Sequence, residues 1–241
     1  MVYTKSLEIK ILVSIFFFFL SGCAFPTPRS WQYSIDSYPT NRQPLLSKRV
    51  AVPPFRDSRP DKNENATSLE GLVLVPFGWV DFSTPEALTD KPFRIFPLWQ
   101  FRPTEYFAKA AAEELDASNL FKEAFFSYRA SEGDIVLRGD IKSTRYRGKI
   151  ITYGLSMGAI VPWMLGLPQG TIHNELEVEF TLVDQLTGAL LWNKSYTLSY
   201  HKSPFWIYNI PSDFDYDNLF KAIMRDVVKS LESTLSGRNG K

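Results

Sequence analysis

Few side chains in this sequence could bind a metal or form a cross-link. The chain has one cysteine, Cys23, and two histidines, His173 and His201. A disulfide needs two cysteines, and a structural zinc site needs about four Cys or His ligands. We therefore expect no internal disulfide, no such zinc site and no cofactor, and Cys23 must have another role.

One serine has the spacing of a catalytic nucleophile. Gly154, Ser156 and Gly158 form the Gly-x-Ser-x-Gly pattern of α/β-hydrolases, and Asp184 and His201 follow in the matching order. That motif needs a parallel sheet, whereas the alternation on both sides of Asp184 predicts an antiparallel hairpin. The predicted hairpin therefore argues against a catalytic triad. We expect a protein that is not an enzyme, with a serine hydrolase at Ser156 as the minor alternative.

The remaining titratable side chains have simpler interpretations. Glu175, Glu177 and Glu179 alternate along a predicted strand, so same-face neighbours lie about 7 Å apart and form a solvated face rather than a metal or acid/base site. We interpret His201 as a surface residue beyond a strand end, and His173 as one at a strand start.

The first 22 residues have the pattern of an export signal. Lys5 and Lys10 precede the apolar run Ile11 to Leu20, which contains four consecutive phenylalanines. A membrane-spanning helix needs about 20 apolar residues, and this run has half that number. Residues 1–22 are therefore predicted to be a signal peptide.

The signal ends in Leu20-Ser21-Gly22-Cys23, which resembles the bacterial lipobox. The resemblance implies that Cys23 receives diacylglycerol and becomes the first residue of a lipoprotein. Several acyl chains, at about 0.8 kcal/mol per buried methylene, would hold it on a lipid bilayer. Ala24 in place of aspartate implies the periplasmic face of the outer membrane. The alternative is an ordinary signal peptide followed by a chance cysteine.

Charge excludes nucleic acid as a partner. Removal of residues 1–22 leaves 25 basic and 25 acidic residues, and no basic cluster is larger than Lys48-Arg49. Binding to phosphates normally requires a basic face that releases counterions.

The mature chain divides into three parts. Residues 23–47, rich in Pro, Ser, Tyr and Thr, are predicted to be a flexible tether, although their aromatic side chains could instead dock on the folded part. Residues 48–236 are predicted to form a single domain. Residues 237–241 are a tail.

Periodicity within residues 48–236 predicts an α+β fold. We expect a mixed or antiparallel sheet of about four strands with two amphipathic helices packed on one face. The predicted strands are 49–52, 134–146, 175–183 and 190–200, and the predicted helices are 104–118, capped by Thr104 and stopped at Asn119, and 217–235.

Three segments carry a family resemblance. Residues 49–60, with the run Val50 to Phe55 followed by Arg56-Asp57, residues 118–122, and the strand 137–141 resemble bacterial envelope lipoproteins. The resemblance is to the superfamily of the curli secretion-channel lipoprotein, penicillin-binding-protein activator lipoproteins and the amino-terminal domain of TolB. It implies an accessory protein that binds another envelope protein or forms a homo-oligomer, without catalytic residues.

Two apolar insertions, 60–103 and 150–172, depart from that family. Ile150 to Thr171 has no charged residue in 22 positions. If exposed, it would contact a membrane or a partner; if buried, it would be a glycine-rich loop over the sheet, and both interpretations remain open. The predicted contact residues are Trp163, Met164, Leu165 and Leu167, with Trp79 and Trp99 from the first insertion.

The sequence thus predicts a lipid-anchored periplasmic accessory lipoprotein that is not catalytic. Its partners would be the bilayer, through acylated Cys23, and another envelope component or the membrane surface. A carrier of a lipid or apolar ligand, with the insertions as pocket walls, is the alternative.

Overall fold

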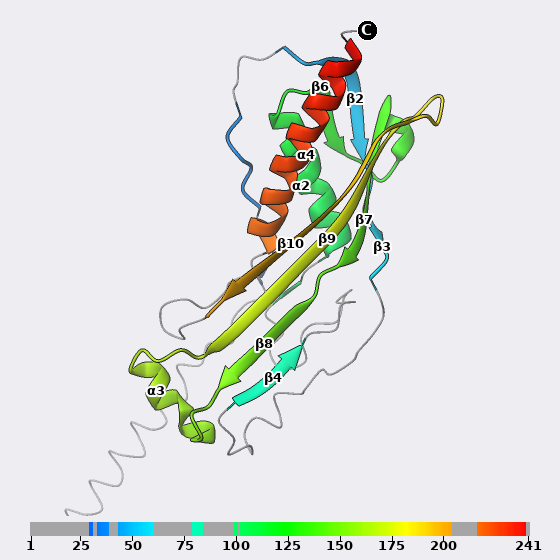
Figure 1. Cartoon of the computed structure of the whole chain (residues 1–241). Helices are drawn as coiled ribbons and strands as arrows, with labels where there is room; N and C mark the ends of the chain where they lie inside the picture. Colours follow the sequence, from blue (N-terminus) through cyan, green and yellow to red (C-terminus); the bar gives the residue numbers. More distant parts are fainter. Residues whose placement is uncertain are drawn as a thin grey trace, which may run out of the picture.

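A computed structural model of the chain describes residues 29–30, 33–38, 43–59, 79–83, 99–100, 102–203 and 216–239. Cys23 and most of the first insertion lie outside these residues. In the described part, a mixed sheet carries helices α2 (Pro103–Ala117) and α4 (Tyr216–Asn239) on one face (Figure 1). The predicted α+β class is confirmed.

The sheet is built around one long strand, β9 (Gly170–Asp184). Strand β10 (Leu190–Lys202) runs antiparallel along one edge of β9, as the predicted hairpin requires. On the other edge, β7 (Ile135–Ser143) pairs with the second half of β9 and β8 (Tyr146–Ile151) pairs with its start.

The remaining strands extend this core. Beyond β7 lie two parallel strands, β2 (Leu46–Val52) and then β6 (Phe121–Phe126). The smaller pieces are β3 (Arg56–Asp57) beside β7, β4 (Trp79–Ser83) beside β8, a separate pair of β1 (Arg29–Ser30) with β5 (Trp99–Gln100), and the 3-10 turn η2 (Ala130–Glu132). The sheet therefore has more strands than the four or so expected.

The boundaries of α2 correct one prediction and confirm another. The helix starts at Pro103 after Arg102, without a side-chain cap, so Thr104 is not its cap. Proline is favoured at the first helical position because its missing N–H would have no helical partner there. The helix ends at Ala117, and Asn119 adopts a left-handed φ of 53°, as expected of a stop residue.

The core lies between the sheet and the two helices. The predicted inward row of β9, Leu176, Val178, Phe180 and Leu182, is fully buried. Phe220 of α4 stacks on Phe107 of α2 with ring centroids 4.5 Å apart, and it also contacts Phe180. This aromatic cluster joins both helices to the sheet.

The family-like segments meet in this core. The ring of Phe55 packs against Gly139, where a Cβ atom would lie only 2.5 Å from a ring carbon. Phe55 also contacts Phe180 edge-on at 5.6 Å. The glycine of strand 137–141 is therefore needed to admit the phenylalanine that ends segment 49–55.

Truncation of Phe220 should test this arrangement. We expect Phe220→Ala to lower the free energy of unfolding by about 3–5 kcal/mol, because it empties the contact between the helices and the sheet. Leu186→Ala, at a side chain that is 94% exposed, should change it by less than about 0.5 kcal/mol. Urea denaturation followed by circular dichroism measures both, and equal effects would contradict the assignment.

Candidate functional site

One part of the sheet extends beyond the helices. We call this part the arm: β8, residues 170–174 of β9, and the connection 152–169 between them. Strand β4 pairs with β8 along the arm, from Ser83 opposite Arg147 to Trp79 opposite Ile151. Figure 1 shows the arm reaching past the start of α4 to a knob that contains α3.

The base of the arm is fixed at Thr144. Arg59 donates a hydrogen bond of 2.7 Å to its hydroxyl, and the Tyr216 hydroxyl donates one of 2.6 Å to its carbonyl. The Arg59 guanidinium, 1% exposed, also holds Asp57 through two bonds of 2.6 and 2.7 Å. Burial would raise the pKa of Asp57, but these bonds lower it overall.

The tip of the arm, residues 152–169, closes on itself. Three bonds cross its neck: Ile151 N–H to the Gln169 carbonyl at 2.8 Å, the Trp163 indole to the Ile151 carbonyl at 2.9 Å, and the Tyr153 hydroxyl to the Pro168 carbonyl at 2.8 Å. Between them lie η3 (Ser156–Ala159) and α3 (Ile160–Met164). Short helical turns thus satisfy much of the tip backbone internally.

Among the described residues, the tip carries most of the exposed large apolar side chains. Of the twelve large apolar side chains exposed in the described residues, seven lie between Tyr153 and Leu167. They are Tyr153, Leu155, Ile160, Val161, Met164, Leu165 and Leu167, and Leu165 is 78% exposed. A cluster of exposed apolar side chains is typical of an interaction surface. Of the two interpretations of insertion 150–172, an exposed contact segment or a buried loop, the structure therefore supports the exposed one.

The predicted contact residues have different places in this site. Met164, Leu165 and Leu167 are exposed, whereas Trp163 is half-buried and holds the tip to β8. The register also brings the backbone of Trp79 beside Ile151 at the tip. The backbone of Trp99 pairs with Arg29 in the small separate sheet and not with a strand of the arm.

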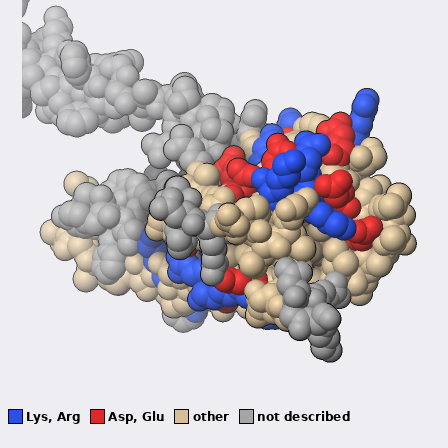
Figure 2. Space-filling view, turned by 90° about the horizontal axis from the view of Figure 1, so that it is seen from above, with Lys and Arg blue, Asp and Glu red and all other residues tan. Residues whose placement is uncertain are grey.

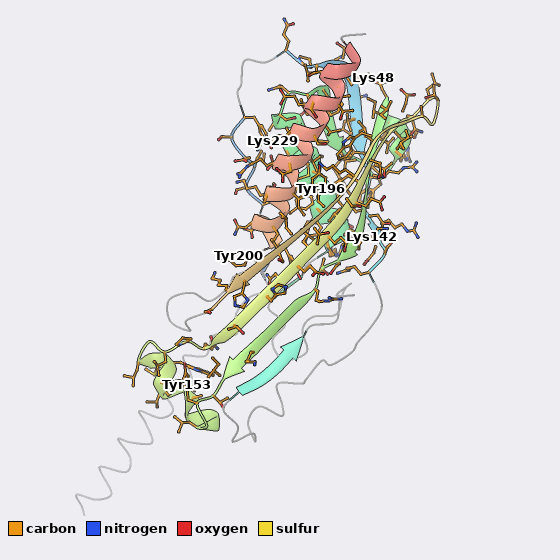
Figure 3. All side chains as sticks on the ribbon, in the orientation of Figure 1. Lys48, Lys142, Tyr153, Tyr196, Tyr200 and Lys229 are labelled. Carbon is orange, nitrogen blue, oxygen red and sulfur yellow. The ribbon has the colours of Figure 1, made fainter. Side chains whose placement is uncertain are left out.

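The opposite end of the molecule is charged. Lys48 pairs with Asp184 at 2.7 Å, and Arg49 pairs with Glu123 at 2.6 Å. Figure 2, which looks onto that end, shows basic and acidic side chains side by side. In Figure 3 the labelled Lys48 and Tyr153 lie at the two ends of the molecule.

The structure rules out the serine triad. His201 is in register with His173, and Asp184 lies eleven residues further along β9, which is about 36 Å away. Asp184 is held by Lys48 instead, and that bond and those from Thr187 lower its pKa to about 2. The strand that leads to Ser156 is antiparallel to both neighbours rather than parallel.

The histidines and the glutamate row also have plain structural roles. His201 lies within β10 opposite His173, at 6.3 Å between ring centroids, so its predicted place beyond a strand end is wrong. Glu175 accepts a bond from Ser143, and Glu179 pairs with Lys142 at 3.3 Å. Across the described ranges, no three His, Cys, Asp or Glu side chains are grouped as metal ligands.

A second feature is a docked N-terminal segment, Tyr33 to Tyr38, which the sequence offered as the alternative to a flexible tether. The Tyr33 hydroxyl donates a bond of 2.7 Å to Glu114, whose carboxylate also accepts one of 3.0 Å from the Asp36 amide. Asp36 pairs with Arg225 of α4 at 2.7 Å. Aromatic side chains of the predicted tether thus dock on the folded part.

One residue in the sequence, Glu114, could have indicated this docking. It lies three and seven positions after Ala111 and Phe107 on the apolar face of α2, and it is fully buried. A buried carboxylate needs hydrogen-bond donors, which the N-terminal segment supplies. Burial, followed by the bond to Glu114, raises the pKa of Tyr33.

None of the described helices is long and apolar enough to span a membrane. No known family matches the sequence, and no curated protein does either.

Solved structures with a similar fold include one from a family of unassigned function. Protein XCC0632 from Xanthomonas campestris, of family DUF330, has a TM-score of 0.51 at 10% identity over 88% of this chain and 99% of that one. Weaker matches are the PelC dodecamer from Paraburkholderia phytofirmans (TM-score 0.36, 13% identity, 81% and 92% covered) and lipoprotein GNA1162 from Neisseria meningitidis (0.26, 14%, 77% and 98%). At 10% identity the first likeness shows the fold alone.

The docked segment should loosen in acid. The hydrogen bond from Arg225 lowers the pKa of Asp36, so the ion pair stabilises docking above the ordinary aspartate value near 3.8 and is lost as pH falls below it. Because Arg225 is half-exposed, solvent screens the pair, and its loss should lower the protection of the Asp36 amide by no more than about fivefold. Hydrogen exchange between pH 3 and pH 6, divided by the intrinsic rate at each pH to give a protection factor, measures this, and Arg225→Gln should flatten the dependence.

Proposed function

We propose that this chain is a lipid-anchored accessory protein of the bacterial envelope, not an enzyme, whose arm tip binds another envelope component or the membrane surface. The observation that carries the proposal is the exposed apolar tip, held away from the helices at the end of the arm. Apolar side chains gathered at the end of a projection gain free energy when a second apolar surface covers them.

The described geometry favours surface contact over a carrier function. A carrier would use Trp163 and Leu165 as pocket walls, but Leu165 is 78% exposed and the Trp163 indole is bonded within the tip. The neck bonds also close the knob on itself. The tip therefore presents its apolar side chains on the outside of an internally bonded loop.

The envelope setting rests on the N-terminal sequence. The signal-like residues 1–22 and the lipobox-like Leu20 to Cys23 support export and acylation, and segments 49–60 and 137–141 support an accessory role through their family resemblance. Ala24 favours the periplasmic face of the outer membrane.

Acylation of Cys23 can be tested directly. We expect the full chain, expressed in a Gram-negative host with an alkyne fatty acid, to become labelled and to fractionate with membranes. Cys23→Ser should abolish the labelling, because no other cysteine is present. Unchanged labelling of that variant would place the lipid elsewhere.

The tip can be tested with two exposed leucines. Leu165 lies at the tip, and Leu186 lies in the turn between β9 and β10 at the opposite end of β9. We expect a photoreactive residue at position 165, in the full chain in cells, to crosslink to an envelope protein or to lipid, and one at 186 not to. Leu167→Asp should weaken the product at 165, since it places a charge in the apolar patch. Identical products at both positions would contradict the proposal.

A further inference from the structure

The N-terminal segment enters the folded part at the end from which the arm projects. Ser30 pairs with Gln100, three residues before α2 begins, and Thr104 in the first turn of α2 accepts a bond of 2.9 Å from the Phe55 amide. From Phe55 the chain runs along β7 to Arg59, which bonds to Thr144 at the arm base. The start of α2 therefore faces the arm.

Contacts along α4 independently show in which direction the N-terminal segment runs. Tyr33 contacts Phe220, while Asp36 bonds to Arg225 more than a turn later. The segment therefore runs away from the first residue of α4, Tyr216, which bonds to Thr144. Traced back from Asp36 to Tyr33, the described segment therefore points toward the start of α4, beyond which the arm extends in Figure 1.

The lengths of two segments allow the lipid anchor on Cys23 and the tip of the arm to reach the same membrane surface. Cys23 and Arg29 are six residues apart, so they are separated by at most about 20 Å even if fully extended. The chain from Thr144 to Ile151, which includes β8, covers up to about 23 Å before the tip begins. A bilayer that holds lipid on Cys23 would therefore lie no further from the body than the arm reaches.

Charge along the arm suits lipid headgroups. No Asp or Glu occurs between Asp140 and Glu175, whereas Arg145, Arg147 and Lys149 precede the apolar tip. Asp81 of β4 is in register with Lys149, and it is the acidic residue that the pairing of β4 brings to the arm. Basic residues behind an apolar end are the arrangement that binds anionic membrane surfaces.

We infer that the arm tip inserts into the bilayer leaflet that holds the lipid on Cys23, and that the docked segment Tyr33 to Tyr38 orients the body for this second attachment. The inference rests on the proposed function and specifies the surface that the tip binds. The anchor and the tip then hold the domain at two points, with its charged end directed away from the membrane.

Fluorescence quenching can separate this bilayer from other surfaces. The native cysteine is expected to be acylated, so Leu165→Cys provides the free thiol for an NBD label in the full lipidated chain. The protein is reconstituted into phosphatidylethanolamine and phosphatidylglycerol vesicles, and doxyl lipids are placed either in those vesicles or in a second population added later. Leu186→Cys is the matched control, and circular dichroism checks folding of both.

We expect at least about twofold quenching at position 165 when the doxyl lipids share the bilayer with the protein, none from the second vesicles, and none at 186 in either case. Quenching only from the second vesicles would overturn the inference, because the tip would then bind an opposing membrane. Absence of quenching would overturn it too. If quenching is absent but the photoreactive residue at 165 captures an envelope protein, the proposed function holds and only the bilayer inference fails. If neither quenching nor capture is seen, the proposed function fails as well.

A double variant tests whether the docked segment Tyr33 to Tyr38 orients the body on the membrane. Asp36→Asn combined with Arg225→Gln removes the ion pair that holds the segment to α4. We expect quenching at position 165 to fall by about half while circular dichroism stays unchanged. Unaltered quenching in a variant whose segment exchanges rapidly would show that docking plays no orienting part.

Discussion

The length of β9 is the constraint on which the rest of the structure depends. The strand has fifteen residues, and the inward row from Leu176 to Leu182 packs beneath the helices. Its first residues continue past them, and their backbone groups are paired by β8 on one side and by the end of β10 on the other. Beyond the helices, β9 can continue as a strand only if other strands pair with its backbone. Strand β8 provides such pairing, and β4 pairs with β8 in turn.

Contacts at one level of the molecule join this arm to the body. Thr144 receives bonds from Arg59 and Tyr216, so the β7–β3 region and α4 meet where the sheet loses its cover. The same end of α4 contacts the N-terminal segment through Phe220 and Tyr33. Because Phe220 also packs on Phe107, the core, the arm base and the docked segment share one set of contacts and should respond together to its loss.

Local periodicity predicted the elements whose pattern is set by burial on one face. This was so for the β9–β10 hairpin and both helices, where rows such as Leu176 to Leu182 repeat at the right spacing. Strands β6 and β8 lack such alternation, since β6 buries only Phe121 and Ala124 and β8 depends on its partner strands. The docking of residues 33–38 was only an alternative to a flexible tether, because it depends on Glu114, which is distant in sequence.

The candidate site shows why spacing and composition alone were insufficient. Ser156, Asp184 and His201 occur in catalytic order, but the antiparallel register places Asp184 at one end of β9 and His201 near the other. A charge-free stretch of 22 residues fits a buried loop as well as an exposed one. The neck bonds of Ile151 and Trp163 decide between them, because they close the backbone internally and leave side chains such as Leu165 outside. Internal bonds to many of the tip's backbone groups lower the cost of placing this apolar surface in a bilayer.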